Sequence, residues 1–114
     1  MKDSIEAENK KIINNINSTD PIHLIKEKEF NEILLSFGSF ISIIKNKRIN
    51  QTMLLLEIIE NKRVRTIFMK LTDIDNIQFL IYNLIIRFPI LCKSKIIKNK
   101  LRDLNDDAAR KRLL

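Results

Sequence analysis

Few residues of this sequence have the chemistry needed for catalysis or metal binding. Among its 114 residues the chain has one histidine, one cysteine and one glycine. His23 and Cys92 are far apart in the sequence, and a structural zinc site needs four nitrogen and sulfur ligands. A single glycine excludes a glycine-rich phosphate-binding loop. The sequence therefore predicts a non-enzymatic protein with no cofactor and no metal ion.

The remaining candidates for chemistry are two carboxylate pairs and a thiol. Asp73 and Asp75 could form an acid/base pair, but capping of a following helix explains them more simply. The two aspartates at 106–107 have the same explanation. Lys93 could lower the pKa of the neighbouring Cys92. The two apolar residues that precede Cys92 instead favour a buried, structural cysteine.

The sequence carries an uneven excess of positive charge, with a net charge of +7. Residues 87–102 include six basic residues and no acidic one, whereas acidic residues gather at 3–8 and 27–32. This asymmetry favours an acidic partner, either a nucleic acid or an acidic peptide. A solvated basic surface without a ligand is the alternative. Shorter basic clusters are Lys45, Lys47 and Arg48; Lys62, Arg63 and Arg65; and Arg110, Lys111 and Arg112.

The composition predicts a folded intracellular protein, nuclear or cytoplasmic. Hydrophobic residues make up 45% of the chain and charged residues 31%, which fits a folded domain and not a disordered chain. A single cysteine fits a reducing compartment. Residues 1–11 are too polar for a secretory signal. The most apolar run, 79–92, contains Asn83, Arg87 and Pro89 and is shorter than the roughly 20 residues of a membrane helix, so no membrane contact is expected.

Hydrophobic periodicity predicts an all-α fold, a compact bundle of five to six helices in a single domain, 1–114. One glycine and two prolines are too few for the turns of a sheet protein. Isoleucine also favours strands, but the length of the apolar run at 77–86 and its lack of glycine argue against a strand there. Apolar residues recurring every three or four positions place the expected helices at 4–17, 21–46, 51–60, 64–71, 74–88 and 90–104, with a basic tail at 105–114.

Several local signals predict where these helices begin and end. Asp20 and Pro21 are suited to start the second helix as its N-cap and first helical residue, after a loosely packed segment at 1–19. Gly38 inside that helix costs about 1 kcal/mol relative to alanine, unless it permits a bend or a close helix crossing. A basic turn is expected at 61–63. The threonine and aspartates of 72–75 are N-cap candidates for the next helix.

The order of segments between residues 49 and 104 resembles a known family of helical bundles. A leucine-rich helix, LLLEIIE at 54–60, leads through a short basic connection to Val64, and a second helix ends in LTDI at 71–74. An apolar helix then ends in RF at 87–88, and the closing segment is CKSKIIKNKLR at 92–102. This order is similar to the family that includes the N-terminal domain of transcription elongation factor TFIIS and the integrase-binding domain of LEDGF. The last two segments are most similar to the LEDGF branch.

Two departures separate the chain from the TFIIS branch. That branch usually has a glycine where this chain has Asp75, and a tryptophan near its last helix, whereas this chain has no tryptophan. The wider family resemblance implies a scaffold that binds short, disordered partner segments rich in acidic and aromatic residues. It further implies an adapter in transcription elongation or chromatin.

In that family, docking uses loops between helices, which correspond here to 61–66 and 72–77. A hydrophobic spot rimmed by cations predicts the same kind of ligand without reference to the family. For Phe68 and Ile74, the two apolar residues of these loops and the helix between them, burial in the core is the alternative role. The implied contacts are Phe68 and Ile74 for apolar groups of the partner, and Lys62, Arg63 and Arg65 for its acidic groups.

Two other functions are compatible with the composition. A basic accessory protein bound to RNA, for example on a ribosome, or to DNA would contact phosphates through the closing helix. That helix lacks the interleaved aromatic residues that stack on bases. A small helical immunity or inhibitor protein that blocks one partner is the third possibility. The nucleic-acid contacts would be Lys93, Lys95, Lys98, Lys100 and Arg102.

Overall fold

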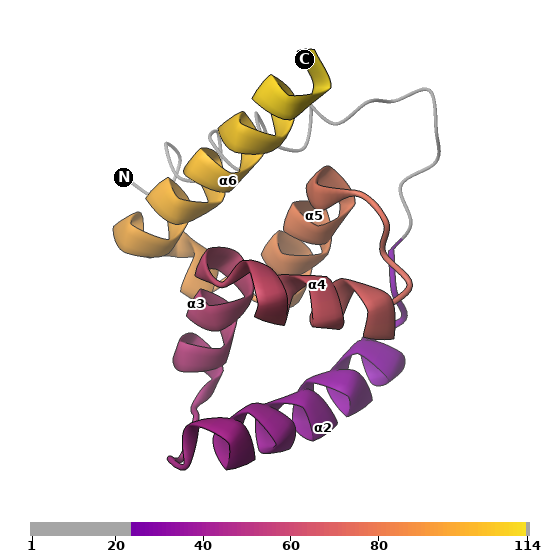
Figure 1. Ribbon diagram of the computed structural model, residues 1–114, viewed down its shortest axis with the longest axis vertical. Coiled ribbons are helices and arrows are strands. Elements are labelled where there is room, and N and C mark those ends of the chain that lie inside the picture. The colour runs from indigo at the N-terminus through magenta and orange to yellow at the C-terminus, as the bar shows by residue number, and fades with distance from the viewer. Residues whose placement is uncertain (1–23, 114) are drawn as a thin grey trace. The chain divides into compact units, whose positions relative to one another are not determined.

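The computed structural model describes residues 24–113, and these residues fold into helices joined by short connections (Figure 1). Within that range there are five α-helices, one short 3-10 helix and no strand. The predicted all-α fold is confirmed, and the alternative of a strand at 77–86 is wrong. The elements are α2 (Glu27–Lys45), α3 (Gln51–Glu60), α4 (Lys62–Leu71), α5 (Ile77–Arg87), the 3-10 helix η1 (Leu91–Lys93) and α6 (Lys95–Leu113).

The described helices belong to two compact units. One unit, Ile25–Asp73, contains α2, α3 and α4, and the other includes α5, η1 and α6. No helix in the described range is both long enough and apolar enough to cross a membrane. The expected helix at 4–17 lies outside the described residues, as do Asp20, Pro21 and His23.

Helix α2 begins at Glu27, so the expected start at residue 21 is wrong. Residues 24–26 are not helical, and Lys26 has an extended backbone with φ −58° and ψ 139°. Glu27 and Glu29 then lie in the first turn, where carboxylates interact favourably with the positive end of the helix dipole. Electrostatics at the helix end therefore favours this start without a capping side chain.

The other end of α2 is closed by a left-handed residue. Asn46 has φ 51° and ψ 44°, and its N–H donates to the Ile43 carbonyl oxygen at 3.2 Å. The Lys47 N–H donates to the Ser42 carbonyl oxygen at 3.1 Å. These two bonds make a Schellman motif, which satisfies carbonyls that the helix leaves unpaired.

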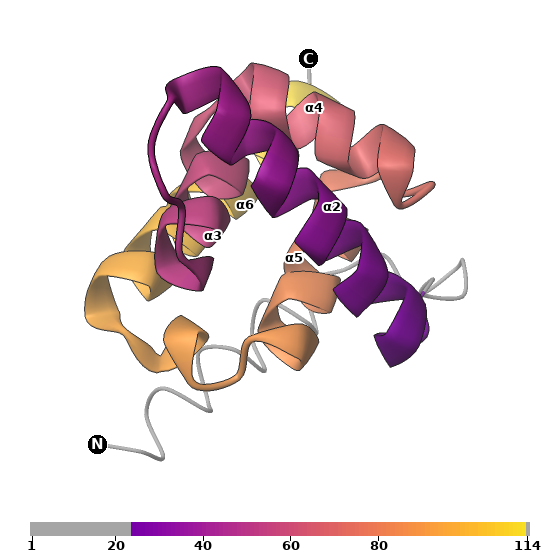
Figure 2. The same cartoon turned by 90° about the horizontal axis from the view of Figure 1, so that it is seen from below.

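The core of the unit Ile25–Asp73 is built around three phenylalanines. The rings of Phe30 and Phe68 meet edge to face, with centroids 5.9 Å apart, and the rings of Phe37 and Phe68 are tilted at 5.4 Å. Leu55 and Ile58 of α3 are fully buried in the same unit. Both views show α2 lying along one side of α3 and α4 (Figures 1 and 2). Phe68 thus links the first helix of this unit to the last.

In the other unit, α5 begins at an asparagine and not at the predicted aspartates or threonine. The Asn76 side chain accepts hydrogen bonds from the Gln78 and Phe79 N–H groups at 2.8 and 3.4 Å. Thr72 instead ends α4, where its hydroxyl donates to the Phe68 carbonyl oxygen at 2.8 Å. The expected caps at 72–75 are therefore wrong, because the threonine is still held by the preceding helix.

The last helix is longer than predicted. Helix α6 runs without interruption from Lys95 to Leu113, so the expected capping of a new helix by the aspartates at 106–107 is wrong. Asn105 is 7% exposed, and its Oδ1 accepts a hydrogen bond from Gln78 Nε2 of α5 at 3.5 Å. The Asn105 side chain is therefore bonded to α5 and does not cap a new helix, which is consistent with its position in the middle of α6. The buried stripe of α6 is Ile97, Leu101 and Leu104.

Candidate protein-binding surface on helix α4

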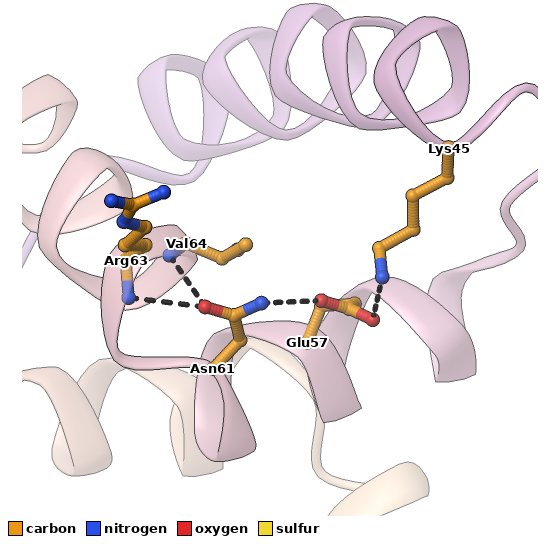
Figure 3. Close-up of polar contacts among 5 residues, drawn as sticks. All are labelled: Lys45, Glu57, Asn61, Arg63 and Val64. Atoms are coloured by element: carbon orange, nitrogen blue, oxygen red, sulfur yellow. Dashed lines mark hydrogen bonds and ion pairs between the residues drawn. The ribbon is translucent and has the colours of Figure 1, made fainter.

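Helix α4 begins immediately after a single asparagine, so the expected three-residue turn at 61–63 is wrong. The Asn61 Oδ1 accepts hydrogen bonds from the Arg63 and Val64 N–H groups at 3.1 and 3.3 Å (Figure 3). The Asn61 N–H donates to the Glu57 carbonyl oxygen at 2.9 Å, which closes α3. One residue therefore ends one helix and caps the next, and Lys62 and Arg63 form the first turn of α4.

The junction between α3 and α4 is also stabilised by a side chain of α2. Lys45 Nζ lies 2.7 Å from Glu57 Oε1, and Asn61 Nδ2 donates to Glu57 Oε2 at 3.4 Å (Figure 3). Both partners of the ion pair are partly shielded, because the Lys45 and Glu57 side chains are 33% and 23% exposed. This chain of polar contacts fixes the start of α4 relative to α2 and α3. In Figure 3 the Arg63 guanidinium points away from it.

The two arginines of α4 have different roles. The Arg65 Nη1 donates to the Ile59 carbonyl oxygen at 2.7 Å and reaches the Ile58 carbonyl oxygen at 3.5 Å. These carbonyls lie at the C-terminal end of α3, where the helix dipole favours a cation. Arg65 is half-buried and stabilises the turn between the helices, whereas Arg63 is exposed.

Phe68 and Ile74, the two predicted apolar contacts, are both buried. Phe68 is 0% exposed and lies in the aromatic cluster, and Ile74 is 4% exposed. Their side chains offer no surface to a partner, and the core role that was the alternative for both fits their burial. The apolar stripe of α4, which consists of Val64, Ile67, Phe68 and Leu71, divides accordingly, since only Val64 and Phe68 are buried.

The accessible apolar residues of α4 are the two remaining members of that stripe. Ile67 is 40% exposed and Leu71 is 52% exposed. Arg63 and Lys70, both exposed, lie on the same face, because residues separated by three, four, seven or eight positions share one side of a helix. We call these four residues, Arg63, Ile67, Lys70 and Leu71, the α4 surface.

The electrostatics of the α4 surface favour an anionic ligand. Helix α4 carries four cations and no acidic residue within its bounds. Lys62 and Arg63 stand in its first turn, where the positive end of the helix dipole adds to their charge instead of offsetting it. This placement costs some helix stability and produces a positive potential beside the exposed Ile67.

No family model, curated protein or solved structure matches the chain. The resemblance to the TFIIS and LEDGF bundles therefore stays a prediction.

The five basic residues of the alternative nucleic-acid site do not share one face. Lys93 lies in η1, before α6 begins. At roughly 100° of rotation per residue, Lys95, Lys98 and Arg102 follow one flank of α6, and Lys100 lies about 140–160° around the helix from them. Only Lys95 and Arg102 are exposed, and the other three are half-buried. The run of basic residues in the sequence therefore becomes two separated groups on the helix.

The remaining candidates for chemistry are dispersed. Cys92 is fully buried, as its apolar neighbours predicted. Asp73 and Asp75 are exposed, and Asp73 adopts a left-handed backbone with φ 56° at the end of α4. In α6, Asp107 lies 3.4 Å from Lys111, one turn further along. Among the described residues no three histidine, cysteine, aspartate or glutamate side chains group as a metal site would require.

The sequence predicted Arg63 of the α4 surface but not its other three residues. Ile67 and Leu71 have the spacing of core residues, and Lys70 was not selected at all. Helical periodicity identifies the apolar side of a helix, but it does not show how much of that side a neighbouring helix covers. The signal in the sequence for a binding surface was the charge of α4, because this helix combines four cations and no acidic residue with an apolar stripe.

Proposed function

We propose that this protein is a non-enzymatic interaction module whose α4 surface binds a partner segment containing acidic and apolar residues. The observation that carries the proposal is the grouping of exposed Ile67 and Leu71 with Arg63 and Lys70 on a helix without acidic residues. Apolar side chains provide contact area, and the cations select partners of opposite charge. The family resemblance extends the proposal to an adapter in transcription or chromatin.

Binding of nucleic acid is the weaker candidate. The basic residues of 93–102 are divided between η1 and separated flanks of α6. Stacking of unpaired bases needs accessible aromatic rings, and within that segment there are none. The α4 surface, in contrast, combines charge and accessible apolar area in one place.

The test measures the affinity of the full chain for a short synthetic peptide in which acidic residues alternate with phenylalanine and leucine. Fluorescence anisotropy of the labelled peptide is expected to show that Arg63→Glu with Lys70→Glu weakens binding by about tenfold, because two attractive contacts become repulsive. The fold should survive, since the Arg63 and Lys70 side chains are both exposed. Arg65 is left unchanged because it stabilises the turn.

The matched control is Lys26→Glu with Lys28→Glu, which makes the same change in net charge at two exposed positions near the start of α2. Its peptide affinity should stay close to that of the unmodified protein. Equal losses in both double variants would show that only net charge matters, and the proposal would fail. It would fail equally if Ile67→Ser, which removes apolar area without changing charge, left the affinity unchanged.

A further inference from the structure

The outer face of α2 carries four of the ten large apolar residues that are exposed in the described part of the chain. Residues 33–44 contain no charged side chain, although α2 lies at the surface of its unit. Four large apolar residues in this stretch are strongly exposed. An exposed apolar patch of this kind marks an interaction site more often than a bare surface. The four residues are Leu35 (74% exposed), Phe40 (46%), Ile43 (78%) and Ile44 (61%).

The polar residues of this face are suited to burial. Ser36 and Ser39 lie among the apolar side chains, and both hydroxyls are already hydrogen-bonded within the helix. The Ser36 hydroxyl donates to the Glu32 and Ile33 carbonyl oxygens at 3.2 Å, and the Ser39 hydroxyl donates to the Leu35 carbonyl oxygen at 3.0 Å. Covering such groups leaves no donor without a partner. Serines are also small, so another helix could approach closely.

Charges of opposite sign predominate near the two ends of α2. Glu29 and Glu32 are exposed near the start of α2 and share the side of Ser36 and Ile43 by helical spacing. Lys47 and Arg48 are exposed just beyond its end. Acid therefore predominates before the apolar segment, where three exposed glutamates outnumber two exposed lysines, and base follows it. A helix with this charge order is complementary to a second copy of itself running in the opposite direction.

We propose that a second copy of this chain covers the outer face of α2, with the two α2 helices antiparallel about a two-fold axis. With the axis level with Gly38, Ser36 of each copy lies opposite Phe40 of the other, so that a small residue meets a large one. Glu29 of each copy then lies toward the end of the other α2, which Lys47 and Arg48 follow. Such an interface closes on itself and uses the same residues twice.

Sedimentation equilibrium of the full chain tests the proposal directly. The unmodified protein should form a dimer, and Ile43→Glu should raise the dimer dissociation constant by about tenfold or more, because a charge would enter an apolar interface. The fold should be retained because Ile43 is 78% exposed. The matched control is Ile96→Glu on α6, at a residue 65% exposed, and it should leave the dimer unchanged. A monomer at all concentrations, or equal effects of both variants, would overturn the proposal.

Reversing the charges tests the antiparallel direction. Glu29→Lys with Glu32→Lys should weaken the dimer, and so should Lys47→Glu with Arg48→Glu, because each change makes the facing ends alike in charge. All four substitutions in one chain should restore the dimer, since opposite charges again face each other. Circular dichroism of each variant is the control that checks whether its helices are retained. If the fourfold variant did not recover association, the antiparallel arrangement would be refuted. This result would not bear on the proposed function, because none of the four substituted residues belongs to the α4 surface.

Discussion

Arg63 and Arg65 are two residues apart on one helix, yet only one of them is accessible to a partner. The Arg65 guanidinium donates to the Ile59 carbonyl oxygen at the end of α3, so its charge stabilises the turn. Arg63 is exposed beside Ile67 and makes up part of the α4 surface. The difference follows from helical rotation, because a step of two residues turns a side chain by about 200° around the axis.

Cys92 shows how burial can make a residue chemically inert. Its side chain is fully buried, and its Sγ lies 3.6 Å from the Leu84 carbonyl oxygen. Burial raises the pKa of the thiol from 9.0 to about 12, because the thiolate would lose its hydration. The neighbouring Lys93 does not offset this effect. The thiol therefore stays protonated, and it is a poor nucleophile at neutral pH.

The raised pKa of Cys92 predicts a pH dependence of stability. The unfolded chain releases the thiol proton near pH 9, whereas the folded protein retains it until about pH 12. The contribution of this group is therefore complete below pH 9, and it declines between pH 9 and 12 by up to roughly 1.4 kcal/mol per pH unit. Urea unfolding of the unmodified protein and of Cys92→Ala between pH 9 and 12 measures this contribution to the free energy of unfolding. The prediction fails if the alanine variant loses stability equally steeply.

At the scale of elements, asparagines decide where the helices begin and end. Asn50, Asn61 and Asn76 each cap the start of a helix through the side-chain oxygen, and Asn46 closes α2 in a left-handed conformation. The abundance of asparagine in the sequence has the character of a compositional bias, yet these four residues have specific roles. By residue type aspartate is as good an N-cap as asparagine, and threonine is also a favoured one. Sequence alone therefore did not distinguish Asn76 from the candidates just before it.

Gly38 provides a test of packing between α2 and α3. A Cβ atom added at this position would lie 3.5 Å from Leu54 Cδ2, an ordinary van der Waals distance. The helix crossing thus has room for alanine, and Gly38→Ala should stabilise the protein by up to about 1 kcal/mol through helix propensity. Thermal or urea unfolding measures the change. Marked destabilisation would mean that the two helices approach more closely than this distance indicates.

For the whole molecule, the all-α class and most helices could be predicted because hydrophobic periodicity depends only on residue spacing. Helix α3 has the predicted bounds, 51–60, and Pro89 follows the end of α5 as a helix-breaking residue should. The surfaces could not be predicted in the same way. Whether Phe68 or Ile67 faces solvent depends on where α2 covers α4, and that contact joins residues distant in the sequence.

The unit Ile25–Asp73 carries two surfaces of different chemistry. The α4 surface combines cations with two exposed apolar residues, whereas the outer face of α2 is uncharged and bounded by opposite charges. A strongly basic surface repels a second copy of itself, so it is suited to an acidic partner. The face of α2 is suited to self-association because its charges are balanced between its two ends. The two proposals can therefore succeed or fail independently.

The most direct test of the proposed function is an amide NMR titration of the full chain with the acidic-apolar peptide and, separately, with single-stranded RNA. The account predicts that the peptide shifts resonances around Arg63, Ile67, Lys70 and Leu71, and that RNA produces weaker changes that disappear at moderate salt. Peptide-induced shifts elsewhere, or none at all, would contradict it. Strong RNA-induced shifts across residues 93–102 would instead show that the basic helix α6 is the functional surface.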